Sequence, residues 1–380
     1  MKLAFIVPGF SADEQDWATP TLDNLTRALA RDHEIHIFAL RYPHNEGRFS
    51  LWSAQVHAFA GHRANGLASP RLWRTTLSAI LREHTRAPFD CLHAFWAYEP
   101  GVVGALARRQ LTPVPLIISV VAGELERRPN IDFGHGRYWH RRWLSRWALQ
   151  RASRITGLSH QHLARIRSIL PLRFHERILR LPYGVDSGHF QPWAGGSAFN
   201  AAQPRLLNVG ALTPVKNQLL LLVAFARVLP EFPAASLTIV GTGPLRASLE
   251  SEAVRLNIEK RVTFTGQIAY REMVALYQQH DLFVQASHME TQGMALLEAG
   301  ACGLPAVSTP VGAALELRSG GVRLVSQDAG PAEFTKAIGT CVSDSGVLEK
   351  MRQELIAQVA ADYTLEATVR LWNDCYASLV

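Results

Sequence analysis

Two glutamates stand in a segment that otherwise carries no charge. Between Leu282 and Leu315 the only formal charges belong to Glu290 and Glu298, eight positions apart. A carboxylate only accepts hydrogen bonds, whereas a pair of neighbouring hydroxyl groups offers two donors. This spacing therefore favours a site that binds two diols, one at each glutamate. Helix capping or pairing with arginine is the alternative for two isolated glutamates.

The residues between the two glutamates have the features of an anion site. A helix is predicted to begin near Gly293 and to end at the stop signal in residues 303–305. Its first turn has no charged side chain, which leaves free backbone N–H groups at the positive end of the helix dipole. Glu298 follows Met294 and Ala295 by four and three positions, so it shares their helix face. A phosphate is therefore expected between the two carboxylates.

Two further stretches offer groups for a diphosphate. Lys216 lies in NVGALTPVKNQ (208–218), after a predicted strand and turn and at the start of a helix. Only five of the 39 basic residues are lysine, so this one is a candidate for a specific charge contact, although an exposed surface lysine is the alternative. Gly241 lies in the Gly-x-Gly turn of VGTGPL (240–245), where Arg246 replaces the third glycine of GxGxxG. This turn predicts a weak nucleotide contact or a simple turn.

Short apolar runs alternate with helix-like segments along the chain, which predicts an α/β fold with two parallel sheets. Residues 1–188 form the first predicted domain and residues 205–363 the second, joined by a proline- and glycine-containing linker at 189–204. The amphipathic segment 364–380 is expected to complete the first domain. Ligands of such sheets bind at the carboxyl ends of the strands, so a cleft between the domains is expected.

Composition excludes several classes of protein. The chain has 380 residues, of which 48% are hydrophobic and 19% charged, as in folded globular proteins. No apolar run reaches the about 18 residues of a membrane span, and residues 2–10 are interpreted as a buried strand rather than a signal peptide, so a cytoplasmic location is expected. The four cysteines and 15 histidines form no CxxC or HExxH motif, and the one pair spaced two apart, His160 and His162, would diverge on a helix, so no structural metal is expected.

Residues 290–307 read ETQGMALLEAGACGLPAV, and this stretch resembles the signature E-G-F-G-x-x-x-L-E-A-M-A-x-G-x-P-V-V of the retaining glycosyltransferases of family 4. The stretches VGALTPVKNQ, TIVGTGPL, RVTFTGQI and DLFVQAS follow the order of that family, and LPYGVDSGHFQP precedes them. The resemblance is strong over about 181–310 and weak before it. It implies the GT-B fold, in which two Rossmann-like domains face each other across a cleft.

The resemblance also implies roles for individual residues. Glu298 would bind the nucleotide ribose, Glu290 a hydroxyl of the donor sugar, and Lys216 the diphosphate that leaves. Further donor contacts are implied for the backbone of Gly293, Met294, Ala295, Gly9, Gly241, Gln267 and Ile268. Since no DxD motif occurs in the sequence, no metal cofactor is expected, and the lysine and the helix dipole would stabilise the diphosphate instead.

Three positions depart from the family pattern. Ala211 stands where the family has arginine, Ala122 where it has histidine, and the first loop, PGFSADEQDW, lacks the usual glycine pair. These changes leave open a non-catalytic sugar-nucleotide or membrane-binding protein on the same fold, or a GT-B epimerase or phosphorylase. The candidates to replace the lost histidine are His93, Glu124 and His135, although a buried histidine with its hydrogen bonds satisfied is the commoner outcome for His93.

The first half of the chain carries most of the positive charge. Residues 1–190 hold 25 Lys and Arg against 15 Asp and Glu, and in RYWHRRWLSRW (137–147) the residues Trp139, Trp143 and Trp147 recur every four positions among arginines. This pattern predicts peripheral contact of segment 137–154 with anionic lipid at the inner membrane surface, or equally a helix whose tryptophans pack on the first sheet. The acceptor is open; lipid-linked or polysaccharide acceptors fit, and no nucleic-acid motif is present.

Overall fold

The chain folds into two α/β units. The computed structural model describes residues 1–66, 68–131, 133–193, 199–317 and 320–380. Met1–Gly184 together with Leu365–Val380 form the first unit, and Val185–Thr364 form the second. Each unit contains one sheet built almost wholly of parallel strands, so the predicted fold class is confirmed.

The first unit is built on an eight-stranded sheet of order β3-β4-β2-β1-β5-β6-β7-β8. Central strands such as β1 and β5 are buried on both faces, which is why their sequences are continuous apolar runs. The strands are β1 (Lys2–Gly9), β2 (Glu34–Tyr42), β3 (Gly47–Leu51), β4 (Ala54–Ala58), β5 (Cys91–Phe95), β6 (Leu116–Ser119), β7 (Arg154–Gly157) and β8 (Ile178–Arg180).

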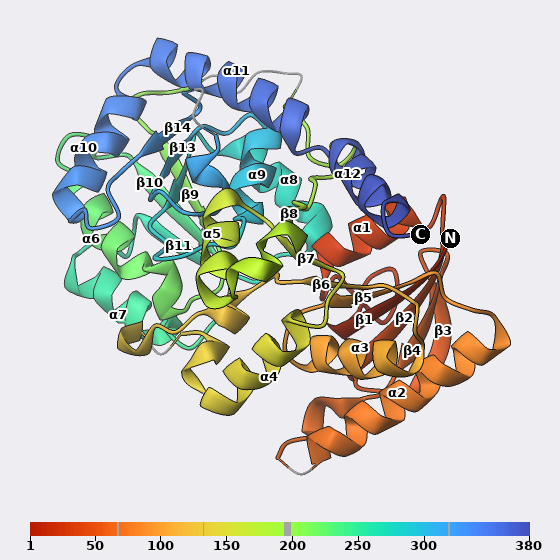
Figure 1. Ribbon diagram of the computed structural model, residues 1–380. Helices are drawn as coiled ribbons and strands as arrows, with labels where there is room; N and C mark the ends of the chain where they lie inside the picture. The colour runs from red at the N-terminus through yellow and green to blue at the C-terminus, as the bar shows by residue number, and fades with distance from the viewer. Residues whose placement is uncertain (67, 132, 194–198, 318–319) are drawn as a thin grey trace. The chain divides into compact units, whose positions relative to one another are not determined.

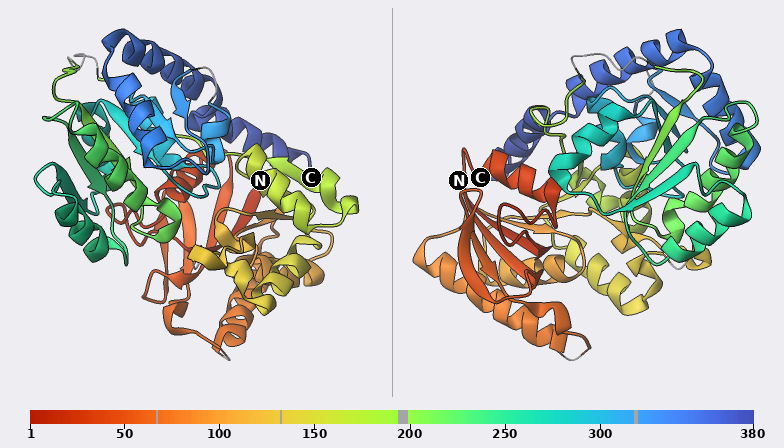
Figure 2. Two further views of the ribbon diagram at one scale, coloured as in Figure 1. Left: turned by 90° about the vertical axis from the view of Figure 1, so that its left-hand side faces the viewer. Right: turned by 180° about the vertical axis from the view of Figure 1, so that it is seen from behind.

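Helices cover both faces of this sheet. One face packs against α2 to α5 through an apolar core, and α1 contacts α12 (Figures 1 and 2). The α-helices of the first unit are α1 (Pro20–Leu29), α2 (Ala68–Arg86), α3 (Glu99–Gln110), α4 (Trp139–Leu149), α5 (His160–Ile169) and α12 (Leu365–Ala377). Its short 3-10 helices are Gly61–Arg63, Gly123–Leu125, Pro129–Ile131, His135–Arg137 and Leu172–Arg177.

The second unit has a six-stranded, fully parallel sheet of order β11-β10-β9-β12-β13-β14. The strand order changes direction between β9 and β12, where an open α/β sheet offers a ligand crevice at the carboxyl ends. The strands are β9 (Arg205–Val209), β10 (Ser236–Val240), β11 (Val262–Gly266), β12 (Leu282–Gln285), β13 (Ala306–Ser308) and β14 (Val322–Leu324).

Two separate apolar cores flank the second sheet. One includes residues of α6, α7 and α10, and the other includes residues of α8, α9 and α11 (Figure 1). The α-helices are α6 (Gln218–Val228), α7 (Arg246–Arg255), α8 (Met273–Gln279), α9 (Met294–Ala301), α10 (Pro331–Val342) and α11 (Ser345–Asp362). The short 3-10 helices are Pro214–Lys216, Tyr270–Glu272 and Gly312–Leu315.

The limits of the two units differ from the predicted domains at 1–188 and 205–363. The first of the two segments that form the first unit ends at Gly184, and the predicted linker 189–204 begins inside the second unit. Phe190 is 1% exposed and its ring contacts Tyr270 and Tyr277, so the start of that linker is packed on the second unit. Residues 194–198 of the linker lie outside the described residues.

The C-terminal helix α12 belongs to the first unit. Trp372 is fully buried, and its indole N–H donates to the carbonyl of Pro182 at 3.2 Å. Tyr376 is also fully buried and its hydroxyl contacts a ring nitrogen of His93 on β5. These two aromatic side chains explain why the last segment of the chain returns to the first sheet.

Candidate functional site

Lys216 and Glu290 meet in the second unit. Lys216 ends the 3-10 helix that follows β9, and Glu290 lies in the loop between β12 and α9. The Lys216 Nζ is 2.6 Å from Glu290 Oε1, and the two side chains are 25% and 10% exposed. Both loops leave the carboxyl ends of adjacent parallel strands, which is why residues 74 positions apart come together.

One oxygen of Glu290 remains open. Ser287 Oγ donates to the same Oε1 atom at 2.7 Å, so this oxygen holds both neighbouring donors. Oε2 accepts no hydrogen bond from the described residues. Glu290 can therefore accept a hydroxyl group of a ligand through Oε2 while Oε1 stays bound to Lys216.

Glu298 lies on α9 and is oriented by a buried tyrosine. The hydroxyl of Tyr277, on α8, donates to Glu298 Oε2 at 2.8 Å, and Tyr277 is 1% exposed. Burial of the carboxyl raises the pKa of Glu298 to about 7, and the hydrogen bond from Tyr277 acts in the opposite direction. The Oε1 atom has no partner among the described residues, so this carboxyl can accept a ligand hydroxyl when it is ionised.

The N-terminus of α9 has the open geometry expected for an anion site. Gly293 is the N-cap residue with φ +91°, a conformation that glycine adopts without steric cost. No side chain caps the helix and its first turn has no acidic residue. Met294 and Ala295 are both partly exposed in that turn. Their backbone N–H groups precede the intrahelical hydrogen-bond ladder and are free to bind an anion.

The other predicted donor contacts of the second unit lie at strand ends. Gly241 follows β10 with φ +134°, and a Cβ there would lie 2.1 Å from the carbonyl oxygen of Gly210, so only glycine fits. Gln267 and Ile268 follow β11, the first exposed and the second partly buried. Because β9 to β12 are parallel neighbours, these residues share one edge of the sheet with Lys216.

Gly9, the remaining predicted donor contact, is part of the first unit. It ends β1 and is buried, and a Cβ on it would lie 3.0 Å from Cβ of Tyr42. A side chain at this position would push Tyr42 away by a few tenths of an ångström, so glycine favours the close packing of β1 against the end of β2. This packing contact is sufficient to explain why a glycine occupies position 9.

His93 is not placed to touch a ligand, which corrects its assignment as a candidate sugar contact. The ring is fully buried, with Nδ1 2.7 Å from the Tyr376 hydroxyl and Nε2 2.7 Å from Ser119 Oγ. The Ser119 Oγ atom is in turn 2.7 Å from the Oγ1 atom of Thr156, so the hydrogen-bonded network extends to β7. Burial holds the pKa of His93 well below its usual range, so the ring is neutral and links α12 to the sheet.

Glu124 is also buried, and backbone groups of the first unit hold its carboxylate. Its carboxylate accepts the backbone N–H groups of Ala97, Val121 and Ala122 at 3.3, 3.1 and 2.8 Å. Burial raises the pKa of Glu124 to about 7, although the hydrogen bonds from these backbone groups act to lower it. The residue therefore fixes the loops after β5 and β6. The third candidate in this group, His135, has a side chain outside the described part of the structure.

One cluster of potential metal ligands occurs among the described residues. His36, His57 and Glu83 are buried in the first unit with ligand atoms within 4.8 Å of one another. However, Glu83 Oε1 already pairs with Arg48 at 3.0 Å and Arg86 at 2.9 Å. The two guanidinium groups oppose a further cation at this carboxylate, so the cluster is better explained as a buried carboxylate held by two partly exposed arginines.

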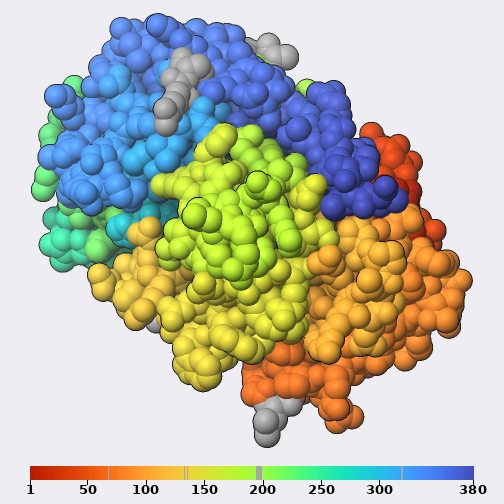
Figure 3. All heavy atoms as spheres, viewed as in Figure 1, coloured from red at the N-terminus to blue at the C-terminus, as the bar shows by residue number. Residues whose placement is uncertain are grey.

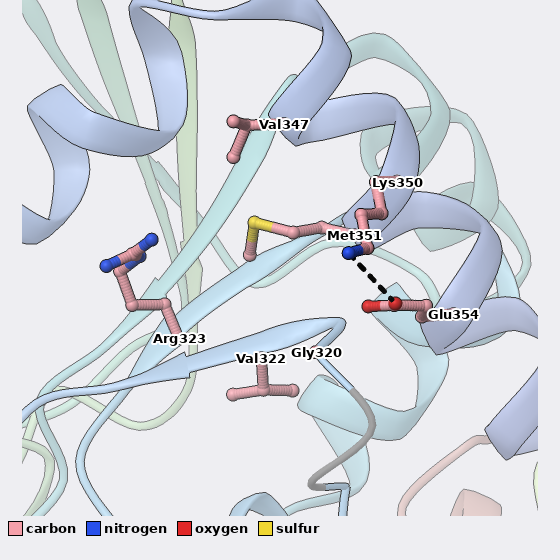
Figure 4. Close-up of a pocket in the computed structure, with 7 residues that line it drawn as sticks. All are labelled: Gly320, Val322, Arg323, Val347, Lys350, Met351 and Glu354. Carbon is pink, nitrogen blue, oxygen red and sulfur yellow. Dashed lines mark ion pairs between the residues drawn. The ribbon is translucent and has the colours of Figure 1, made fainter.

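A surface groove of about 490 Å³ lies elsewhere on the second unit (Figure 4). It runs between the edge strand β14 and helix α11, and the charges of Lys350 and Glu354 pair within it at 4.0 Å, with Arg323 apart from them. None of the residues predicted for the site lines this groove. Its size alone gives no reason to place the chemistry there.

Tyr277 and Ser287 are functional candidates that the sequence did not reveal. Tyr277 lies in an amphipathic helix segment, REMVALYQQH, where a tyrosine is usually part of the core. Ser287 is one polar residue at the end of a buried strand. Only the tertiary contacts with Glu298 and Glu290 distinguish them from ordinary core and loop residues.

The tryptophans of α4 do not all pack on the sheet. Trp139 is 74% exposed and Trp143 is 61% exposed, while Trp147 packs against the core of the first unit. Figure 3 shows the yellow segment that contains α4 at the surface of the molecule. The helix thus presents two large aromatic side chains to solvent. Among the described residues, no helix combines the length and apolar character that a membrane span requires.

Two family models match the chain. The model of the glycosyl transferase 4-like domain matches residues 18–184, and the model of glycosyl transferases group 1 matches residues 191–360. Together they cover nearly all of both units.

Curated relatives share partial sequence identity. The chain is 40% identical over 103 residues to alpha-monoglucosyldiacylglycerol synthase of Streptococcus pneumoniae, which covers 27% of this chain and 23% of that protein. It is 29% identical over 345 residues to the GDP-mannose-dependent alpha-(1-6)-phosphatidylinositol monomannoside mannosyltransferase of Mycolicibacterium smegmatis, with 85% of both chains covered. For three further relatives the matched region spans only 42%, 59% and 44% of their length.

Solved structures show the same fold over the full chain. Sucrose-phosphate synthase from Thermosynechococcus elongatus superposes with a TM-score of 0.80 at 19% identity, covering 100% of this chain and 99% of that chain. HepE of Anabaena in complex with UDP and glucose superposes with a TM-score of 0.77 at 18% identity, with 100% of both chains covered. At these identities the likeness establishes the fold, which is GT-B, as the sequence motifs predicted.

Proposed function

Because the chain belongs to the glycosyl transferases of group 1, we propose that it moves a sugar from a nucleotide-diphosphate-sugar to an acceptor hydroxyl, with retention of anomeric configuration. One observation carries the proposal. In the second unit, Lys216, Glu290 and the open N-terminus of α9 form one group at the carboxyl edge of the sheet, and Glu298 lies one turn further along that helix. This group offers a cation, backbone N–H donors and two carboxylates, which match a diphosphate between two diols.

The donor is assigned as follows. The diphosphate binds at the N–H groups of Gly293, Met294 and Ala295 and at Lys216, which stabilise the charge that develops as it leaves. Glu290 accepts a sugar hydroxyl at Oε2, and Glu298 accepts the ribose diol at Oε1. Gly241, Gln267 and Ile268 border the site on the side of β10 and β11, where the base would lie.

The transfer step needs no protein nucleophile. The acceptor oxygen forms the bond to the anomeric carbon while the bond from that carbon to the diphosphate oxygen breaks. The acceptor proton passes to the departing diphosphate oxygen on the same face of the sugar. Glu290 is a poor candidate for covalent attack because Lys216 and Ser287 both bind its Oε1 atom and stabilise its charge. Its role in the proposal is to position the sugar.

Metal independence is part of the same proposal. The sequence contains no DxD motif, and the second unit supplies Lys216 and a helix N-terminus at the expected diphosphate. These groups provide fixed positive potential, which is the contribution that a divalent ion makes in metal-dependent transferases.

The acceptor is proposed to be lipid-linked. One relative is named for a glycolipid that it synthesises, monoglucosyldiacylglycerol, and another for a phosphatidylinositol monomannoside. The exposed Trp139 and Trp143 of α4, with basic neighbours Arg142 and Arg146, form an interfacial surface of the kind that binds anionic membranes. This supports peripheral contact with a membrane surface during transfer.

The test is calorimetric binding of UDP, GDP and ADP, and of their sugars, to the full chain in EDTA. We expect one nucleotide to bind without metal and its sugar conjugate to release nucleoside diphosphate when an acceptor is supplied. Binding without any turnover would favour the non-catalytic alternative, and phosphate-dependent turnover or an epimerised donor would favour a phosphorylase or epimerase. Failure of all three nucleotides to bind well-folded protein would refute the proposal.

A further inference from the structure

A cavity of about 180 Å³ opens in the first unit, apart from the residues assigned to the donor. Its lining includes Pro8 near the end of β1, Arg41 near the end of β2, and Trp96, which directly follows β5. These three strands are parallel neighbours, so the cavity lies at the carboxyl edge of the sheet, where open α/β sheets bind ligands. Tyr98 and Arg141 also line the cavity.

The charge of Arg41 is neutralised within the wall. Its Nε and Nη2 atoms donate to the two oxygens of Glu99 at 2.5 and 2.8 Å, and Nη1 donates to the carbonyl of Gly61 at 2.9 Å. Glu99 also accepts the indole N–H of Trp73 at 3.1 Å. This ion pair is therefore a fixed part of the wall, and it adds no net charge to the cavity.

Arg141 carries a charge that no described carboxylate balances. Its guanidinium stacks over the ring of Tyr138 at 4.6 Å and over that of Tyr98 at 5.6 Å. Its Nε atom is buried and has no hydrogen-bond acceptor. Stacking on two aromatic rings, with a hydrogen bond to the side chain of Tyr98, holds the plane of the guanidinium in place, and no described carboxylate accepts its N–H groups. Arg141 is thus a preorganised donor at a cavity.

The backbone of the cavity wall is held in an unusual conformation. Trp96 has φ +103°, which non-glycine residues rarely adopt and which occurs most often at functional sites. Its N–H donates to the carbonyl of Ser119 at 2.8 Å, and its carbonyl accepts the N–H of Gly101 at 2.9 Å. These bonds fix the turn after β5, and the turn puts the tryptophan in the cavity wall.

We propose that this cavity binds an anionic group of the acceptor, a phosphate ester, with Arg141 as the residue that receives it. A guanidinium fork matches the oxygens of a phosphate, and the aromatic walls suit the carbon atoms of the esterified polyol. At about 30 Å³ per water molecule, the cavity has room for roughly six waters, so it holds the phosphate and a small part of the polyol. The inference rests on the proposed function, because it names the class of acceptor for that transfer.

The ester has two sources, a soluble polyol phosphate or the phosphate of a lipid headgroup. The probes are inorganic phosphate, glycerol 3-phosphate, glycerol, and vesicles of phosphatidylcholine with and without phosphatidylglycerol. The variants are Arg141→Gln and Arg141→Lys, with Arg109→Gln as the matched control, because Arg109 is exposed on α3 and has no described ion pair. Each Gln variant removes one positive charge, so non-specific attraction to anions falls equally in both.

We expect glycerol 3-phosphate to bind wild type and Arg109→Gln alike, glycerol not to bind, and Arg141→Gln to lose at least tenfold in affinity. Arg141→Lys keeps the positive charge but loses the paired N–H groups of the guanidinium, so its affinity for glycerol 3-phosphate is expected to fall by a smaller factor. This variant tests the same contact if Arg141→Gln is unstable. If the protein binds only to vesicles that contain phosphatidylglycerol, and Arg141→Gln weakens this binding while Arg109→Gln does not, the lipid headgroup is the source of the phosphate ester. Equal binding by Arg141→Gln, Arg141→Lys and Arg109→Gln overturns the proposal.

Nucleotide binding to the same preparations separates the two claims. If a nucleotide binds but the binding of phosphate esters does not depend on Arg141, the inference about the acceptor is wrong and the transferase proposal stands. If phosphate esters bind through Arg141 and no nucleotide binds, the cavity is an anion site but its role in transfer is wrong.

Discussion

Lys216 and Glu290 form an ion pair of 2.6 Å at the carboxyl edge of the second sheet, although 74 positions separate them in the chain. The pair joins the residue assigned to the leaving diphosphate with the residue assigned to the sugar. Because the ammonium and one carboxylate oxygen already hold each other, a bound donor meets side chains in fixed positions. Such preorganisation is how a site stabilises developing charge without reorganising during the reaction.

Replacing Lys216 with alanine is expected to lower kcat by about 10²–10³, the usual cost of removing one preorganised donor at a developing charge. Lys260→Ala is the control, because Lys260 is exposed on the same unit. Steady-state release of nucleoside diphosphate measures the effect. A Lys216→Ala enzyme with unchanged kcat would contradict the assignment of this lysine to the leaving group.

Glu298→Ala is expected to weaken nucleotide binding by about 10- to 100-fold, since hydrogen bonds to a charged acceptor contribute about 1.5–3 kcal/mol. Calorimetry of the nucleotide in EDTA measures the change, and Glu259→Ala, an exposed glutamate of the second unit, is the control. If both variants bind the nucleotide as wild type does, Glu298 does not contact the ribose.

Tyr277→Phe is expected to move the pH dependence of nucleotide binding upward. Burial raises the pKa of Glu298 to about 7 and the Tyr277 hydrogen bond lowers it, so loss of that bond raises it further. The ionised carboxylate is the better acceptor, and affinity should increase as pH rises through the pKa. The neighbouring thiol of Cys302 is neutral in this range, because burial raises the pKa of Cys302 to about 12. Calorimetry from pH 5.5 to 8.5 is the measurement; a purely structural role for Tyr277 would weaken binding equally at every pH.

His93→Leu is expected to destabilise the first unit without changing nucleotide affinity. The substitution leaves the buried Tyr376 hydroxyl without its ring partner, which costs about 1–3 kcal/mol in the free energy of unfolding. The native ring stays neutral, while in the unfolded chain it takes up a proton below its ordinary pKa of 6.5. Wild-type stability should therefore fall as pH drops below about 6.5, and the variant should lose this part of the pH dependence. Urea unfolding at pH 5 and 8 tests both effects, and loss of activity in a variant of unchanged stability would return His93 to the list of ligand contacts.

The double substitution Trp139→Ser and Trp143→Ser is expected to reduce binding to anionic vesicles at least tenfold while leaving the fold intact. Both side chains are largely exposed, so their removal opens no core cavity. Leu172→Ser is the matched control, because Leu172 is 80% exposed on a different segment of the first unit. Vesicle sedimentation provides the measurement. Equal sedimentation of the double variant and wild type would remove α4 as the membrane contact.

Local pattern was sufficient for the central strands and for the helix that carries Glu298. Strands such as β1, β9 and β12 are buried on both faces, so they appear as continuous apolar runs between helical segments. The edge hairpin of β3 and β4 carries no such local signal, for a physical reason. Its turn residues Trp52 and Ser53 have φ values of +52° and +62°, and neither is the glycine or asparagine that normally marks such a turn.

The sequence by itself determined the family, the alternation of strands and helices, and the order of the donor-site motifs, because these depend on residue types at short spacing. The tertiary structure alone decided which polar groups meet. It joined Lys216 to Glu290 and Tyr277 to Glu298, buried His93 between two hydroxyl groups, and placed Arg141 over two tyrosine rings in the wall of a cavity. Contacts between strands that are distant in sequence set these environments, and burial and hydrogen-bond partners are properties of the packed chain rather than of any local segment.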